Sequence, residues 1–373
     1  MAERVEEEQG DERQGLLGSA SSSAESEGAL AEPSAAIELG GRTAWAQWRI
    51  LFPTACQVTA QFLISSSTQQ VTILFVGHLG VVELGAAALA TMWVNITGLS
   101  IVYGGRSALD TLASQAYGAK NYQLAGLWSA RFMAIVTLMC VPIAFAWWAA
   151  CGPVLRAIGI DPVTAEAGEV FCRAYIPWMW PMFCAQTIQS WLRAQGVTRP
   201  VTVLIFLSLL LHIPTTWLFV EQLGFVGAPL ALSVNAWVFL FMLVVYCKRN
   251  RQTRRCLPNV ALCDPQLRAD WGVLLRLGGA GALSFMGSWW MWELIGGSAG
   301  MLGTVPLAAH AAMSQFSMVV FPFFVGGCFA ATARVGNLLG AGEPELAIIC
   351  SRGAIGGVMF QISVALFAVF MAR

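Results

Sequence analysis

The chain has 373 residues, of which 57% are hydrophobic and 11% are charged, and its mean hydropathy is +0.65. Soluble domains carry about 25% charged residues, so this composition excludes an ordinary soluble enzyme and indicates a membrane protein. The formal net charge is zero, which gives no reason to expect binding to nucleic acid. The ten cysteines form no C-x-x-C pair, so neither a metal site nor a disulfide framework is expected.

Residues 1–44 are predicted to form a disordered, acidic tail on the cytosolic side of the membrane. The first 40 residues contain ten acidic side chains against only Arg4 and Arg13, and they are rich in serine. A segment of this composition cannot bury enough apolar surface to offset the entropy lost on folding.

Nine apolar segments are long enough to cross a bilayer as helices, which requires about 20 residues each. In chain order they are 50–76, 85–107, 127–150, 169–190, 201–221, 225–247, 273–297, 305–333 and 346–371. The sequence therefore predicts an all-α, polytopic membrane protein.

Lysine and arginine are distributed unevenly between the connecting segments. If the N-terminus lies in the cytosol, 18 of the 21 basic residues fall on the cytosolic side, and the other side receives Arg156, Arg173 and Arg373. This bias follows the positive-inside rule and predicts a cytosolic N-terminus. It does not distinguish the plasma membrane from the vacuolar membrane.

Two parts of the sequence resemble each other. GHLGVVELGAAAL at 77–89 matches GMLGTVPLAAHAA at 300–312, and AYGAKN at 116–121 matches LGAGEP at 339–344 after a slip of one residue. The first copy contains six spans and ends in the basic loop near residue 250. Because six is an even number, the second copy enters the membrane in the same direction as the first. The pattern predicts a parallel repeat of a kind found in secondary transporters.

The repeat predicts a two-lobed transporter fold. Residues 45–250 form a complete six-helix N-terminal lobe, residues 251–270 form a basic cytosolic linker, and residues 271–373 form a C-terminal lobe with three of six helices. A full second copy would need three more spans. We therefore expect either a fragment or incomplete gene product, or a protein with two unequal halves.

Six stretches carry a resemblance to a known family. They are VGHLGVVELGAAALA at 76–90, NITG at 95–98, ALDTLASQAYGAKNY at 108–122, WLRAQGVTRP at 191–200, GSWWMWELIGGSAGMLG at 287–303 and ATARVGNLLGAGEPELA at 331–347. Their order and spacing over residues 45–373 resemble eukaryotic members of the multidrug and toxic compound extrusion (MATE) family. The resemblance implies two six-helix lobes around a central cleft, with this chain ending after the ninth span. It also implies export of organic cations in exchange for an inward-moving cation, usually H⁺.

Glu293 is the candidate for carrying the coupling cation. Outside the tail, every other acidic residue falls in a loop or near the end of a span, and a charge at membrane depth costs about 2.5–3.5 kcal/mol. Burial beside indole rings disfavours the charged form of a carboxyl group, so Glu293 could hold either a proton or a cationic substrate. In the family's E-W-W-x-x-E pattern, Glu293 matches the second glutamate and Ser288 replaces the first. The alternative is that Glu293 extends to the outer membrane interface.

Five residues are candidates for binding substrate. Trp290 and Trp292 could form cation–π contacts with it, although packing against a neighbouring helix or lipid is an equal alternative. The repeat pairs Gln70 with Glu293, and Asn95 lies within the second span. The two amides could bond to substrate or to other helices. Ser288 completes the set because of its place in the family pattern.

Arg106 and Asp110 are predicted to form a gate or a structural salt bridge, because they are spaced i,i+4 at the inner end of the second span. The sequence has many tryptophans, and those near the outer ends of spans are expected to be interfacial anchors. These are Trp147, Trp148, Trp178 and Trp180.

The sequence predicts a secondary active transporter that exports organic cations by antiport with H⁺ or Na⁺, and H⁺ is favoured. It is expected to act as a monomer in a lipid bilayer, with no other cofactor. The sequence has no H-E-x-x-H motif and no Walker lysine, so neither an enzyme nor an ATP-driven pump is expected. Two alternatives remain open: a non-transporting membrane fragment, and a flippase for a lipid-linked oligosaccharide.

Overall fold

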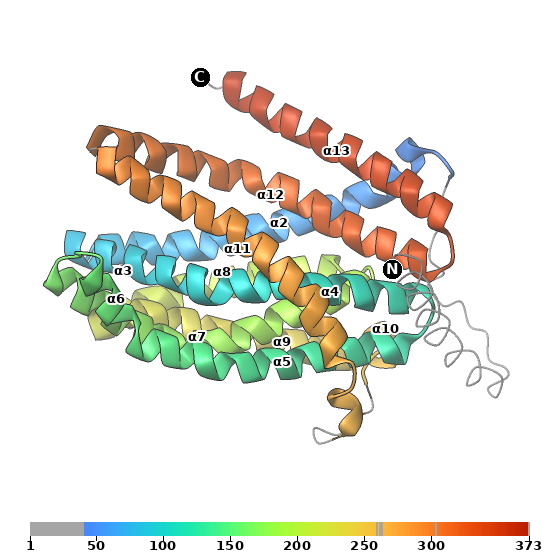
Figure 1. The fold of residues 1–373 in the computed structure, drawn as a ribbon, viewed down its shortest axis with the longest axis horizontal. Coiled ribbons are helices and arrows are strands. Elements are labelled where there is room, and N and C mark those ends of the chain that lie inside the picture. The colour runs from blue at the N-terminus through green and yellow to red at the C-terminus, as the bar shows by residue number, and fades with distance from the viewer. Residues whose placement is uncertain (1–40, 259, 261–263, 303, 372–373) are drawn as a thin grey trace, which may run out of the picture. The chain divides into compact units, whose positions relative to one another are not determined.

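The computed structural model describes residues 41–258, 260, 264–302 and 304–371. Every regular element among these residues is a helix (Figure 1). The prediction of an all-α protein is therefore confirmed. Most of the predicted tail, residues 1–40, lies outside the described residues. Among the described residues the first helix begins at Ala44, and the boundary of the tail stays a prediction.

Long helices account for most of the described chain. They are α2 (Ala44–Gly77), α3 (Val81–Val94), α4 (Ser100–Gly118), α5 (Tyr122–Ala149), α7 (Pro162–Ala194), α8 (Arg199–Leu223), α9 (Gly227–Arg249), α11 (Trp271–Leu302), α12 (Thr304–Gly340) and α13 (Pro344–Met371). The short elements are η1 (Asn95–Leu99), α6 (Cys151–Ala157), η2 (Gly224–Val226), α10 (Arg251–Arg255) and η3 (Pro265–Leu267). Each of the nine predicted spans falls on one long helix, except that α3, η1 and α4 together form the second span.

Five helical stretches of the described chain are long and apolar enough to cross a membrane. They are Val81–Gly118, Tyr122–Ala149, Arg199–Arg249, Val320–Gly340 and Pro344–Val364. Helices α2 and α7 are also long, but α2 contains many glutamines, serines and threonines, and α7 contains charged residues. Some of these polar groups bond to other helices: Gln61 Nε2 donates to the carbonyl oxygen of Thr198 at 3.1 Å. Such pairing makes polar helices tolerable within a bundle.

The internal repeat is visible in the helices. The first three helical stretches have 34, 38 and 28 residues, and α11, α12 and α13 have 32, 37 and 28. Helix α4 ends at Gly118 and α12 ends at Gly340, and each is followed by a residue with positive φ, Lys120 at 61° and Gly342 at 76°. The two helix ends therefore have the same local turn, as the sequence match predicts.

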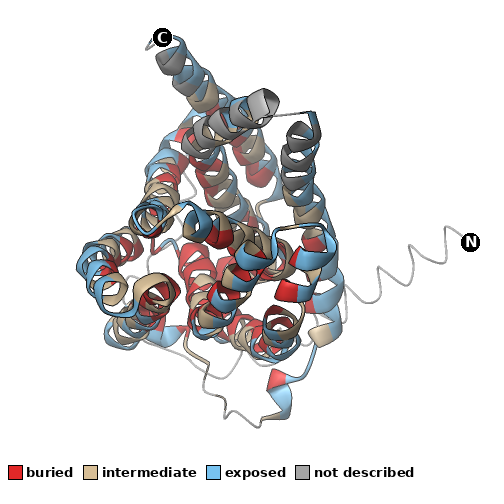
Figure 2. Cartoon of the chain, turned by 90° about the vertical axis from the view of Figure 1, so that its left-hand side faces the viewer, coloured by how far each residue is buried: buried red, intermediate tan, exposed pale blue. Residues whose placement is uncertain are grey.

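The helices of the second repeat, α11 to α13, pack on those of the first. Helix α11 lies along α4, α12 lies along α2 and α4, and α13 packs on α12 and α2 (Figure 1). On the other side of α4, helices α5, α7 and α9 form a bundle with α3 and α8. The buried residues gather inside these contacts (Figure 2). The division into two lobes stays a prediction.

Two of the predicted interfacial tryptophans are buried in the core instead. The Trp147 side chain has no exposed surface, and its Nε1 donates to Thr97 Oγ1 at 2.9 Å. Trp178 is also buried and contacts the Tyr175 ring edge-on. Sequence position near a span end did not reveal which face of the helix each indole occupies. Trp148 and Trp180 are exposed, in agreement with the expectation.

Candidate functional site

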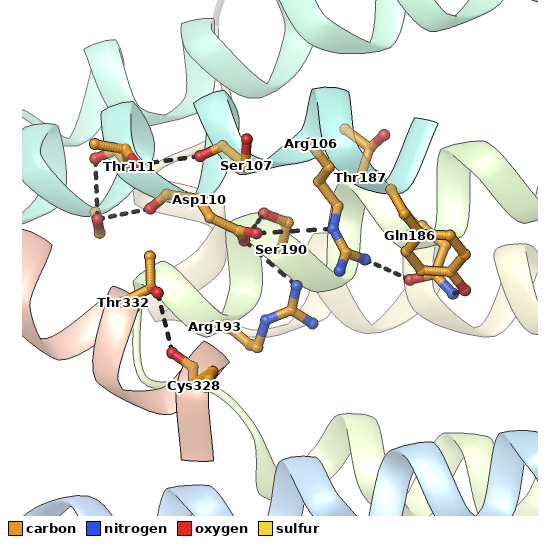
Figure 3. Close-up of polar contacts among 12 residues, drawn as sticks. Arg106, Ser107, Asp110, Thr111, Gln186, Thr187, Ser190, Arg193, Cys328 and Thr332 are labelled. Carbon is orange, nitrogen blue, oxygen red and sulfur yellow. Dashed lines mark hydrogen bonds and ion pairs between the residues drawn. The ribbon is translucent and has the colours of Figure 1, made fainter. Parts of the chain in front are cut away.

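A group of charged and polar side chains is buried where α4 and α7 meet α12 (Figure 3). We call it the arginine cluster, and its members are Tyr103, Arg106, Asp110, Gln186, Ser190 and Arg193. Its three charged side chains are almost fully buried, with exposed fractions of 1% for Arg106, 5% for Arg193 and 7% for Asp110. A charge in such a place is costly unless it is paired, so this cluster requires a physical explanation.

Asp110 is the centre of the arginine cluster. Its Oδ2 lies 3.8 Å from Nε of Arg106, and its Oδ1 lies 3.4 Å from Nη2 of Arg193. The Ser190 hydroxyl donates a hydrogen bond to the same Oδ1. The predicted contact between Arg106 and Asp110 is therefore present, and Arg193 joins it from the neighbouring helix. Whether this contact acts as a gate stays a prediction.

A second line of hydrogen bonds connects Arg106 to an aromatic ring. Nη1 of Arg106 donates to Oε1 of Gln186 at 2.6 Å (Figure 3). Nε2 of Gln186 in turn donates to the Tyr103 hydroxyl at 3.0 Å. Within the described residues, Nε and Nη2 of Arg106 and Oδ2 of Asp110 have no hydrogen-bond partner. The cluster thus holds two cations against one carboxylate, and its hydrogen bonds are incomplete.

The arginine cluster breaks the symmetry of the repeat. The alignment that pairs Gly118 with Gly340 places Cys328 at the position of Arg106 and Thr332 at the position of Asp110. Thr332 donates its hydroxyl hydrogen to the carbonyl oxygen of Cys328 at 3.0 Å, within its own helix (Figure 3). Packing of the two copies alone does not require the charged pair, because the second copy packs without one.

Beyond the cluster, α4 and α12 approach each other closely along glycines. We call this contact the glycine seam, and its residues are Ser114, Gln115 and Gly118 of α4 and Gly336, Asn337 and Gly340 of α12. A Cβ atom on Gly118 would collide with the backbone of Asn337, and one on Gly340 would collide with the backbone of Gln115. These contacts are reciprocal, because the repeat pairs Gln115 with Asn337 as well as Gly118 with Gly340.

A second pair of contacts follows the same symmetry. Gly104 of α4 lies against the backbone of Ala282 in α11, and its repeat partner Gly326 of α12 lies against the backbone of Thr59 in α2. Self-complementary contacts of this kind are what a two-fold relation between two copies produces. The contacts between α2–α4 and α11–α12 are therefore those that a pseudo-two-fold relation between the two copies predicts.

Replacing Gly340 by alanine is expected to weaken this packing by about 1–3 kcal/mol, because the added methyl group forces the α4 backbone to move. The control is Gly356→Ala on α13, where a Cβ atom has nothing within 4 Å. Melting temperatures of the purified proteins in detergent measure the difference. Equal melting temperatures for the two variants would contradict the close contact.

Three aromatic rings connect the arginine cluster to α11. The Tyr103 ring lies 6.0 Å from the ring of Phe285 and 6.1 Å from that of Trp289, and these two are 5.2 Å apart, centroid to centroid. Trp289 was not a predicted site residue, although it lies in the predicted tryptophan-rich stretch. Its indole contacts Tyr103 in the first half of the chain.

The candidate coupling residue lies on the same helix. Glu293 is one turn beyond Trp289 on α11, and its side chain lies outside the described residues. Ser288 is exposed, and its hydroxyl donates to the carbonyl oxygen of Ser284 at 3.2 Å. Trp290 and Trp292 have exposed fractions of 40% and 52%. Their roles stay predictions.

The two polar candidates of the first half lie apart from the cluster. Gln70 is exposed on α2, and Asn95 is the first residue of η1, a turn of π-helix between α3 and α4. Turns of π-helix that interrupt an α-helix are frequent at functional sites. The Trp147 ring packs against Gly98 of this turn and leaves no room for a side chain there. Of the predicted site residues, the structure brings only Arg106 and Asp110 together among the described side chains.

Sequence reasoning missed the residues that α7 contributes. Gln186, Ser190 and Arg193 lie at positions i, i+4 and i+7, which share one face of a helix. This spacing is a signal that could have been found. The predicted span ends at residue 190 and leaves Arg193 outside it, whereas α7 continues to Ala194 and buries Arg193.

A mostly apolar cavity of about 480 Å³ lies beside the glycine seam, between α4, α12 and α13. Thr111 and Gln115 of α4 supply polar groups to its wall, and none of the predicted site residues lines it. Within the described part of the chain, no group of three His, Cys, Asp or Glu side chains is placed to bind a metal ion.

Known proteins resemble this chain over most of its length. The MatE family model matches residues 58–218 and 281–373. An uncharacterized transporter of Schizosaccharomyces pombe is 31% identical over 329 residues, which cover 85% of this chain and 60% of that protein. Multidrug and toxin extrusion protein 1 of Xenopus tropicalis is 32% identical over 288 residues, covering 77% of this chain and 49% of that protein.

Solved structures agree with these matches. The crystal structure of the eukaryotic MATE transporter AtDTX14 superposes with a TM-score of 0.77 at 27% identity, covering 83% of this chain and 69% of that one. A mutant of the Vibrio cholerae MATE transporter VcmN has the same fold with a TM-score of 0.77 at 20% identity, covering 87% of this chain and 74% of that one. This chain spans 49–60% of the length of the two curated relatives described above. The chain is a multi-pass membrane protein that belongs to the multidrug and toxic compound extrusion (MATE) family.

Proposed function

We propose that this chain forms the translocating core of a secondary active transporter that exports small organic cations in exchange for H⁺. Membership of the MATE family carries this proposal, because its relatives include proteins named for multidrug and toxin extrusion. The reciprocal packing of α2–α4 and α11–α12 supports it. Two similar units that meet at a pseudo-two-fold axis can rock against each other and expose a site to either side in turn.

In this mechanism the glycine seam is the closed end of the transport route. The distribution of lysine and arginine favours a cytosolic position for that end, in which case the described conformation faces outward. Rocking would separate α12 from α4 at the seam and close the opposite end. The arginine cluster lies next to the seam and would hold or release it, which is the gate role proposed for Arg106 and Asp110.

Glu293 would couple this movement to the proton. A carboxyl group that holds a proton cannot at the same time attract a cationic substrate, so the two compete for one site. Trp290, Trp292, Gln70, Asn95 and Ser288 would contribute to the substrate site around it. A contiguous set of contacts leads from α11 to the arginine cluster, through Trp289, Tyr103 and Gln186. Binding at Glu293 could therefore bias the seam.

The test is uptake of a fluorescent organic cation by proteoliposomes that contain the purified chain. We expect transport against the cation gradient when a pH gradient is imposed, and loss of transport when nigericin collapses that gradient. Transport that persists without a pH gradient but needs Na⁺ would assign Na⁺ as the coupling ion. If no cationic dye moves under either gradient, the exporter proposal is wrong, and scrambling of a labelled lipid-linked oligosaccharide then tests the flippase alternative.

A further inference from the structure

One ring from the second half of the chain lies close to both buried arginines of the first half. The centroid of the Phe329 ring is 4.9 Å from the guanidinium carbon of Arg106 and 5.0 Å from that of Arg193. Phe329 belongs to α12, whereas Arg106 and Arg193 belong to α4 and α7. The same ring stacks on Phe62 of α2 at 5.7 Å, with 6° between the ring planes.

The charges of the cluster explain why a ring is favourable at this position. Two guanidinium groups share one carboxylate, and two nitrogen atoms of Arg106 have no hydrogen-bond acceptor among the described residues. The negative face of an aromatic ring attracts a cation, and the attraction grows when water is excluded. Arg106 has a ring on each of two sides, Tyr103 at 5.1 Å and Phe329 at 4.9 Å. Phe329 therefore compensates part of the charge that Asp110 alone does not balance.

We propose that Phe329 is a latch that holds α12 against α4 and α7 by contacting both guanidinium groups, and so keeps the glycine seam closed. Opening the seam removes the ring from both arginines and leaves two cations with one carboxylate. The closed state is thereby favoured over the open one. A gate role for Phe329 in transport rests on the proposed function, but the effect of Phe329 on the seam is measurable without any transport.

The position of Ser114 makes opening of the seam visible. Ser114 has no exposed surface, and its hydroxyl lies against Gly336 in the closed seam. A cysteine at this position is nearly the same size and reacts with a thiol reagent only when the seam opens. When opening and closing are faster than the reaction, the labelling rate is proportional to the open population.

The experiment measures labelling of the cysteine in three forms of the full chain. The parent carries Ser114→Cys alone, and the other two carry it together with Phe329→Leu or with Phe329→Tyr. Peptide mass spectrometry reads each cysteine separately. We expect Phe329→Leu to raise the labelling rate at residue 114 about tenfold, which corresponds to about 1.4 kcal/mol. Leucine keeps apolar volume but has no π face, whereas tyrosine keeps the ring. Phe329→Tyr is therefore expected to label at the parent rate.

Two controls separate a latch from general loosening. Cys184 is buried in α7 at 2% exposure, away from the seam residues, and its labelling rate should stay constant in every variant. Phe324→Leu changes an exposed phenylalanine of the same helix, for which the described residues show no cation–π contact, and it should also label at the parent rate. The latch is wrong if Phe329→Leu leaves labelling at residue 114 unchanged, if Phe329→Tyr accelerates it equally, or if Cys184 accelerates as well. Because no substrate is present, a failure of transport leaves this result unaffected.

Discussion

Substitution of Glu293 by glutamine is expected to abolish export of organic cations while leaving insertion into the membrane intact. The amide has nearly the same shape as the carboxyl group, but it can neither release a proton nor carry a negative charge. If one carboxyl group alternates between proton and substrate, both halves of the exchange fail together. Proteoliposome uptake of a fluorescent cation under an imposed pH gradient measures the loss, and the amount of monodisperse protein in detergent measures insertion and folding.

The matched control is Glu221→Gln, which removes an acidic group that is exposed at the end of α8. This variant is expected to export at the parent rate, because Glu221 lies near a span end and has no part in the exchange. Full export by Glu293→Gln would remove the coupling role from this residue. In that case Glu293 would be a carboxylate that extends to the membrane interface, as the alternative interpretation of the sequence states.

The helices could be predicted from sequence because length and apolarity alone determine whether a segment can cross a bilayer. All nine predicted spans fall on long helices. The repeat was also predictable, although it depended on matches between small residues, which are individually weak. Gly118 and Gly340 explain why these matches are informative: each lies where another backbone leaves no space for a side chain. Both copies therefore have glycine where their backbones meet.

The arginine cluster was only half predictable. The contact of Arg106 with Asp110 follows from their spacing on one helix, because residues i and i+4 are neighbours. Arg193 and Phe329 reach the same place from helices that are distant in the sequence, and local spacing contains no information about such packing. A single sequence also cannot show which face of a helix is buried when nearly all of its residues are apolar. Trp147 was assigned to the membrane interface for this reason, yet it is in the core.

The buried charges make a strong prediction about stability. Asp110→Asn is expected to lower the free energy of unfolding by about 3–5 kcal/mol, because it leaves two buried guanidinium groups without a carboxylate. Both arginines lose their charged partner at once, since Asp110 contacts Nε of Arg106 through one oxygen and Nη2 of Arg193 through the other. Thermal unfolding in detergent, followed by size-exclusion chromatography, measures the loss as a lower melting temperature.

Asp270→Asn provides the comparison that isolates burial. Asp270 also pairs with an arginine, since its Oδ2 lies 2.9 Å from Nη1 of Arg131, but its side chain is 51% exposed. Solvent screens the exposed carboxylate of Asp270, and the buried Arg131 keeps its hydrogen bond to the carbonyl oxygen of Gln266, so this change is expected to cost about 1 kcal/mol. Adding Arg193→Gln to Asp110→Asn removes one of the two cations that have lost their carboxylate. This double variant should recover part of the lost stability, because the two sites are in direct contact. If Asp110→Asn melts at the same temperature as Asp270→Asn, the buried charges of the cluster do not stabilise the closed packing of α4 on α7 and α12.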